Sequence, residues 1–168
     1  DMADRHVGTV KGATSVSYGR DATDRVVERK VGSSTVARYS YSAGGDTADL
    51  TLNSSSTVVE ATLSLPGGVL YTFKPSTPAS SVWSYPNLGG SVMATASQAG
   101  VKQGSTLLWD PDGNPVAQAG LPDNTAGNWD FGWHGGAQRP LEHETGLLPT
   151  VEMGARQYVP GLGRFIRS

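Results

Sequence analysis

Short runs of alternating apolar and polar residues recur along most of the chain. Alternation places every second side chain on the same face of an extended segment, so each run predicts a half-buried β-strand. Clusters of Gly, Pro, Asp, Asn and Ser separate the runs, and these residues favour turns. The predicted strands are residues 14–18, 25–31, 35–41, 48–52, 57–65, 69–73, 82–85, 91–96, 105–109 and 115–117.

The segments between these strands have the composition of hairpin turns. Pro66-Gly67-Gly68 separates two strand candidates, and such a sequence is a strong hairpin signal. The turns at 20–24 and 110–114 are rich in Asp, whose carboxylate can accept a hydrogen bond from the backbone two residues on. An aromatic residue followed by a polar turn recurs near positions 18, 41 and 109. This degenerate repeat predicts a coiled or stacked sheet of successive hairpins.

Composition supports an all-β fold. Glycine and proline account for 22 and 10 of the 168 residues, which disfavours long helices. The hydrophobic share of 37% is low, so we expect an extended sheet with one face outside a dry core. A net charge of −2 with scattered arginines gives no electrostatic footprint for nucleic acid.

The same composition excludes several classes of protein. The chain contains no cysteine, which rules out disulfides and cysteine-based zinc sites. Its apolar runs are too short to predict a membrane-spanning helix. It shows no signal peptide, but it begins with Asp1, so we expect that a signal could have been lost upstream.

Two clusters of acidic residues could be imagined as metal sites. Glu142, His143 and Glu144 lie close together in sequence, with His134 nearby, but a solvated charged loop is the simpler interpretation. Residues 110–114 begin like a calcium loop, yet Pro115 stands where such a loop requires Gly. A hairpin turn is therefore the preferred interpretation there, and we expect no metal or other cofactor.

Nothing in the sequence predicts an enzyme. Gly-x-Ser-x-Gly does not occur, and no serine is marked out as a partner for the three histidines. We therefore assign no catalytic residue.

Aromatic residues alternate in one segment near the C-terminal third. Trp129, Phe131 and Trp133 are two residues apart, so on a strand they would share one face. That face could pack against the rest of the protein, or it could stack against sugar rings as a glycan-binding platform.

The C-terminal segment reads as a strand that enters a tight turn. Arg156 and Tyr158 would share a face of this strand, and Pro160, Gly161 and Gly163 would reverse the chain. A buried Arg156 could tie neighbouring strands together through its five N–H donors. We expect a structural rather than a chemical role for this segment.

Two blocks resemble the Rhs/YD-repeat proteins, and in particular their Rhs repeat-associated core segment. The first is Trp83 to Val92, which includes Leu88-Gly89-Gly90-Ser91-Val92. The second matches the pattern Glu-Thr-Gly-Leu followed by Ala-Arg-x-Tyr-x-Pro-x-Leu-Gly-Arg-Phe. The matching positions are Glu144, Gly146, Leu147, Ala155, Arg156, Tyr158, Pro160, Gly163, Arg164 and Phe165. Residues 20–25 are also similar to a YD repeat.

The resemblance implies a fold and a role. The fold would be all-β, with antiparallel hairpins spiralling into a hollow shell: residues 1–13 as a lead-in, 14–80 as YD-repeat-like hairpins and 81–168 as the core segment. In this family the shell encloses and helps deliver a C-terminal toxin in competition between bacteria. The implied partners are the remainder of the shell and that toxin, and the implied location is secreted or at the bacterial cell surface. The chain would end before the toxin junction.

Two other functions stay open. The chain could be a cell-surface adhesion or carbohydrate-binding module of teneurin-like type that binds cell-surface glycans. It could also be an orphan fragment without an independent function, whose uncovered sheet edges favour aggregation.

Overall fold

A computed structural model describes residues 5–116, 130–154 and 156–166 of the protein. Over these residues the regular structure consists of two antiparallel β-sheets and four short 3-10 turns. The all-β prediction is therefore confirmed. None of the described residues forms a helix long and apolar enough to cross a membrane.

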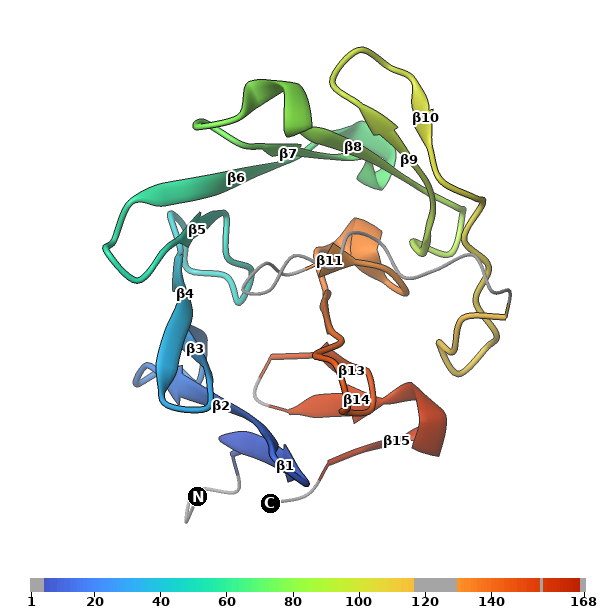
Figure 1. Cartoon of the computed structure of the whole chain (residues 1–168). Helices are drawn as coiled ribbons and strands as arrows, with labels where there is room; N and C mark the ends of the chain where they lie inside the picture. Colours follow the sequence, from blue (N-terminus) through green and yellow to red (C-terminus); the bar gives the residue numbers. More distant parts are fainter. Residues whose placement is uncertain (1–4, 117–129, 155, 167–168) are drawn as a thin grey trace.

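The first sheet is a continuous series of hairpins. Its ten strands pair in the order in which they occur in the chain, each antiparallel to the next (Figure 1). The strands are β1 (Gly8–Lys11), β2 (Thr14–Arg20), β3 (Val26–Val31), β4 (Ser34–Ser40), β5 (Leu50–Leu52), β6 (Val58–Ser64), β7 (Leu70–Phe73), β8 (Val82–Pro86), β9 (Val92–Ser97) and β10 (Lys102–Gln103). The predicted arrangement of successive hairpins is therefore present, with eight of the predicted strands matching β2 to β9.

Two parts of this sheet differ from the sequence prediction. The lead-in contains a strand, because β1 pairs with β2 from Gly8 to Lys11. The last strand is β10 rather than residues 105–109. There the backbone leaves the sheet because its apolar side chains turn inward: Leu107 is 7% exposed, and the Trp109 indole N–H donates to the Val92 carbonyl at 2.8 Å.

The Asp-rich turns form as predicted. Asp21 Oδ1 accepts hydrogen bonds from the backbone N–H groups of Thr23 and Arg25, at 2.8 and 3.0 Å. Asp110 Oδ1 closes the later turn in the same way, accepting from Asp112 and Asn114 at 2.9 and 2.8 Å. The segment that begins like a calcium loop is therefore a hairpin turn held by the Asp110 carboxylate and by backbone hydrogen bonds between Asp110 and residues 113 and 114.

The second sheet has five short strands, again in chain order. They are β11 (Asp130–Phe131), β12 (Pro140–Glu142), β13 (Thr150–Glu152), β14 (Gln157–Val159) and β15 (Arg164–Phe165). The 3-10 turns are η1 (Pro66–Gly68), η2 (Pro78–Ser80), η3 (Gly135–Ala137) and η4 (Pro160–Leu162). The first sheet continues past residues 80 and 81; the boundary that the resemblance implies there, between YD-repeat-like hairpins and the core segment, stays a prediction.

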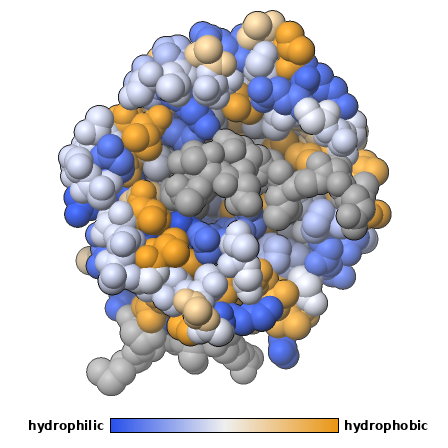
Figure 2. Space-filling view, in the orientation of Figure 1, coloured by the Kyte–Doolittle hydropathy of each residue, from blue (hydrophilic) through white to orange (hydrophobic). Residues whose placement is uncertain are grey.

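The first sheet curls around the second. In Figure 1 the strands β1 to β10 follow an arc, and β11 to β15 lie inside it and return to β1. The described surface in this view alternates between polar and apolar residues (Figure 2).

Two apolar clusters hold the described parts together. One lies against β2, β3 and β4 and contains Val16, Tyr18, Val26, Ala37 and Tyr39, with Leu147 from the second sheet's β12–β13 connection packed on it. The other joins both sheets and consists of Leu70, Val92, Leu107 and Phe131. Each core therefore includes a residue from beyond position 129, so the inner sheet is part of the packing.

Candidate functional site

Charged and polar side chains fill the space between the two sheets beside the first apolar core. We call them the interface cluster: Tyr18, Arg20 and Arg29 from the first sheet, and Glu142, Glu144, Glu152 and Gln157 from the second. Burial of this many charged groups is costly unless they are paired. The pairing of these groups therefore fixes the position of the second sheet against the first.

Arg29 on β3 is the first anchor. Arg29 is 2% exposed. Its guanidinium donates two hydrogen bonds to the Glu142 carboxylate: Nε donates to Oε2, and Nη2 donates to Oε1 at 2.8 Å. Nη2 also donates to Glu144 Oε2 at 2.7 Å. Burial alone would lower the pKa of Arg29, but the hydrogen bonds to Glu142 and Glu144 outweigh it and raise that pKa further. The cation is therefore held charged in the interior.

Tyr18 on β2 donates to the same carboxylate. Its hydroxyl lies 3.0 Å from Glu142 Oε2. Burial, reinforced by the negative charge of Glu142, raises the pKa of Tyr18 well above its ordinary value. The tyrosine thus remains a neutral donor and completes the hydrogen bonds of Glu142.

Arg20 is the second anchor, and it is held mainly by backbone oxygens. Its Nε donates to the His6 carbonyl at 3.0 Å, and its Nη1 donates to the carbonyls of Asp24 and Gly154 at 2.6 and 3.1 Å. Its Nη2 reaches Glu152 Oε2 at 3.2 Å. Arg20 therefore joins the loop after β13 to the turn between β2 and β3.

Glu152 on β13 has an unusual environment for a carboxylate. Its side chain is 9% exposed. Burial raises the pKa of Glu152 to about 7, although Arg20 and a hydrogen bond from Gln157 both lower it. Glu152 can therefore change its charge near neutral pH.

His143 pairs with Asp130 at the opposite side of β12. The two side chains are 5% and 9% exposed, and His143 Nε2 is bonded to Asp130 Oδ2. Burial alone would lower the pKa of His143, but the hydrogen bond and charge of Asp130, with the charge of Glu142, raise it above the ordinary value. The imidazole therefore binds its proton more tightly than in water.

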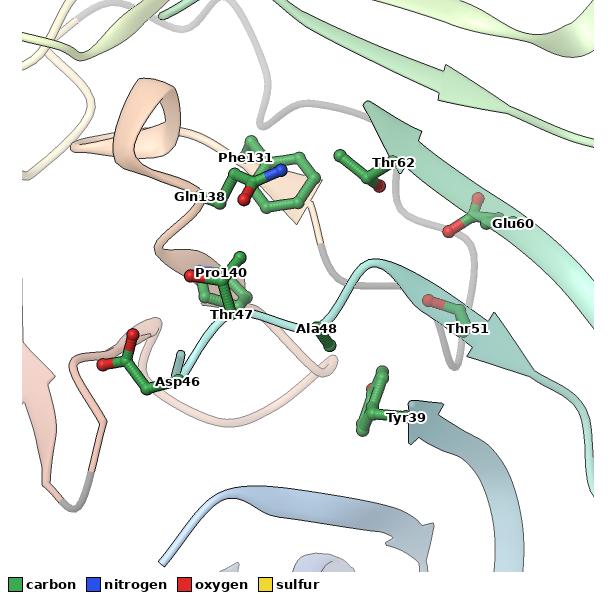
Figure 3. A pocket seen from close by; sticks show the side chains of 10 residues that line it. All are labelled: Tyr39, Asp46, Thr47, Ala48, Thr51, Glu60, Thr62, Phe131, Gln138 and Pro140. Carbon is green, nitrogen blue, oxygen red and sulfur yellow. The ribbon is translucent and has the colours of Figure 1, made fainter. Parts of the chain in front are cut away.

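A small pocket among the described residues lies next to Tyr39 of the first apolar core. It is lined by residues of both sheets, with Phe131, Gln138 and Pro140 facing Thr51, Glu60 and Thr62 (Figure 3). Its volume is about 10 Å³, which is room for about one water molecule. It is too small for an organic substrate.

The structure corrects the interpretation of residues 142–144. The prediction of a solvated charged loop is wrong, because Glu142 is buried on β12 and the His143 side chain is nearly inaccessible to solvent. The described residues contain no group of three or more His, Asp or Glu side chains that could hold a metal ion. One sequence feature could have indicated a buried charge: Arg29 is a charged residue at a strand position where the alternating pattern predicts a buried apolar side chain.

The C-terminal turn forms as expected. Pro160 opens η4, Gly163 has φ of 60° and donates its N–H to the Pro160 carbonyl at 3.0 Å. Tyr158 then pairs with Phe165 and Val159 with Arg164. Gly146 has φ of 90° in the turn after β12, and Leu147 packs on the first core. Among the described residues that match the family pattern, only Glu144 is bonded to a buried arginine, Arg29.

Arg156 does not have the predicted role. It is exposed, and its guanidinium lies over the Phe165 ring, 4.5 Å from the centroid. The prediction of a buried Arg156 that ties strands together is wrong, and Arg20 and Arg29 have that role instead. Ala155 lies outside the described residues.

Of these aromatic residues, the two that the structure describes do not share one exposed strand face. Phe131 is 9% exposed within the second core. Trp133 lies in a turn rather than a strand and stacks on Tyr158, with centroids 5.2 Å apart. Trp129 lies outside the described residues.

These features define a class: all-β proteins in which a curled series of antiparallel hairpins is closed by an inner sheet. No protein-family model matches the sequence, and no curated protein matches it either.

A solved structure is similar to this chain over nearly all of its length. It is the crystal structure of TcdB2-TccC3-TEV, with a TM-score of 0.58, 19% sequence identity and coverage of 96% of this chain. The chain spans only 8% of the length of that chain. At this identity the likeness concerns the fold.

Proposed function

We propose that the chain is a non-catalytic structural portion of an Rhs/YD-repeat shell, which encloses a C-terminal toxin and helps to deliver it in competition between bacteria. Its mechanism is containment: the hairpin wall keeps the cargo away from the producing cell until the shell opens. The site of action would be outside the cell or at its surface.

One observation carries this proposal. Ten strands pair in strict chain order and curl around a second sheet, and this arrangement aligns with 8% of a far longer chain. Pairing in chain order is the topology that a segment of a larger β-shell requires, because further strands before β1 or after β10 can join the same sheet. The sequence resemblance at residues 83–92 and 144–165 points to the same family.

The interface cluster gives the containment a physical basis. Arg20 and Arg29 fix the inner sheet on the curled wall through side chains that are 2% and 3% exposed. A wall that must not open spontaneously requires such fixed contacts between its layers.

The first test is the polypeptide that follows Ser168 in the natural protein. We expect a segment that kills a bacterial host when it is expressed alone and is harmless when it is joined to the shell. A membrane anchor or a stop directly after Ser168 would refute the proposal.

The second test examines containment in that longer protein. Limited proteolysis should spare the downstream segment, and Arg29→Gln should expose it to the protease. The matched control is Arg38→Gln on the neighbouring strand β4, where the side chain is 43% exposed; it should leave the protection intact. Equal cleavage in all three proteins would contradict enclosure by this wall.

A glycan-binding function is not favoured by the described residues. Phe131 belongs to the core, and one face of Trp133 is occupied by Tyr158. Adhesion of teneurin-like type therefore has no specific observation in its support.

A further inference from the structure

The interface cluster carries an excess of negative groups. Among the described residues, three carboxylates, those of Glu142, Glu144 and Glu152, are bonded to two arginines, Arg20 and Arg29. One negative charge is therefore uncompensated in a space that is largely closed to water, with side chains 9 to 18% exposed on these carboxylates. One bound proton would balance the cluster, so protonation is the simplest way to relieve its excess charge.

Glu152 is the carboxylate least needed as a counter-ion. Arg20 already donates to three backbone carbonyls at 2.6 to 3.1 Å, whereas its contacts with Glu152 measure 3.2 and 3.4 Å. Glu142, in contrast, receives the direct grip of Arg29 and the hydroxyl of Tyr18. Loss of the Glu152 charge would therefore leave Arg20 well bonded.

The side-chain amide of Gln157, which is hydrogen-bonded to Glu152, has an unused acceptor atom. Gln157 is 1% exposed, and its Nε2 donates to Glu152 Oε2 at 3.1 Å. Its Oε1 is buried and has no hydrogen-bond partner among the described residues. An orphaned acceptor of this kind costs free energy. A protonated Glu152 supplies an O–H donor next to this amide, which an ionised Glu152 cannot do.

Among the described residues, the groups that act on the charge of Glu152 come from four elements: Arg20 on β2, Tyr41 after β4, Arg139 before β12 and Gln157 on β14. Those that face His143 are Asp130 on β11 and the neighbouring Glu142. Arg139 itself is paired with Asp46 at the surface, at 2.7 Å.

We propose that the interface cluster is an acid-tightened clamp: proton binding at Glu152 strengthens the docking of the inner sheet, and proton loss above neutral pH loosens it. This role goes beyond containment, and it would hold for the chain by itself. It makes the closure between the layers sensitive to the pH of the compartment.

The direction of the effect follows from linkage. A carboxyl whose pKa is about 7 in the folded protein and about 4.5 in the unfolded chain binds more protons when folded. Its contribution to stability is complete below about pH 4.5 and disappears as the pH rises through 7. From Glu152 alone, the equilibrium constant for unfolding should increase on the order of a hundredfold between pH 5 and pH 8.

The experiment measures unfolding of the 168-residue chain in urea by tryptophan fluorescence at several pH values from 5 to 8. The wild type should lose stability as the pH rises, and Glu152→Gln should lose most of that dependence because the amide cannot ionise. Asp112→Asn makes the same chemical change in an exposed turn and should keep the wild-type dependence. A flat wild-type profile, or an unchanged slope in Glu152→Gln, overturns the clamp.

A measurement on the wild type covers the case in which Glu152→Gln does not fold. Unfolding in urea at pH 6, in weakly buffered solution, should release about one proton per molecule from Glu152. Proton uptake, or no exchange of protons, overturns the clamp. The readout is independent of any toxin, so failure of the clamp and failure of the proposed containment are distinguishable.

Discussion

Replacement of Arg29 by methionine should destabilise the protein far more than any surface substitution. Methionine fits the space approximately and keeps the apolar stem of the side chain. The change leaves the Glu142 carboxylate, which is 9% exposed, without the cation that grips it through two nitrogens. Removal of one partner from a buried ion pair typically costs about 3–5 kcal/mol. Tyr18 still donates to Glu142, so we expect a value of about 3 kcal/mol, toward the lower end of that range.

The assay is urea unfolding at pH 7, with an exposed arginine as the control. Arg38→Met removes a side chain that is 43% exposed and lies 3.7 Å from Glu28, a contact expected to contribute below about 1 kcal/mol. The double variant Arg29→Met with Glu142→Met should recover much of the lost stability, since it removes the buried charge that Arg29→Met alone leaves unpaired.

Two results would refute this reasoning. If Arg29→Met and Arg38→Met have the same small effect, the inner sheet does not depend on the interface cluster. If the double variant is less stable than Arg29→Met, then the cost does not come from an unpaired Glu142.

Three further changes test other parts of the structure. Leu70→Ala should lower the free energy of unfolding by about 2–5 kcal/mol because Leu70 is fully buried, whereas Leu63→Ala, at a side chain that is 55% exposed, should have little effect; similar losses in urea unfolding would place the core elsewhere. Gly113→Ala should reduce the melting temperature in calorimetry, since Gly113 has φ of 90° and a Cβ atom would lie 2.5 Å from the Trp133 ring; an unchanged melting temperature would contradict that contact. His143→Gln should reduce stability more at pH 5.5 than at pH 8.5: the folded pKa of His143 is raised, so its contribution is complete below about 6.5 and is lost as the pH rises through the folded value. Equal losses in urea midpoints at both pH values would show that Asp130 does not favour the charged imidazole.

The sequence pattern predicted the first sheet well because its signals are local. Alternation identified β2 to β9, and Asp21 and Asp110 close their turns with hydrogen bonds to residues two and four positions away. β10 was misplaced because Leu107 and Trp109 look like alternate strand positions, yet they pack on residues of β9 and on Phe131. β12 and β13 were not predicted from the sequence; all three residues of each strand are buried, Glu142, Thr150 and Glu152 among them, so neither has the buried–exposed alternation of a half-buried strand.

The interface cluster could not be predicted because its partners are far apart in the sequence. Arg29 and Glu142 are separated by 113 residues, and Arg20 and Glu152 by 132. The sequence shows only charged residues on strands, which usually face solvent. Likewise Arg156 looked like the structural arginine because it lies in a conspicuous pattern, whereas its exposed position follows from the course of β14 and β15.

The inner sheet depends on the wall for its stability. Its strands have two or three residues each, and isolated strands of that length are not stable in water. Their buried faces carry Glu142 and Glu152, which would repel one another without Arg29 and Arg20 from the outer sheet. A stable inner sheet therefore requires the arginines of the outer sheet. Weakening of the cluster should consequently loosen the closure between the two sheets more than it affects the outer sheet itself.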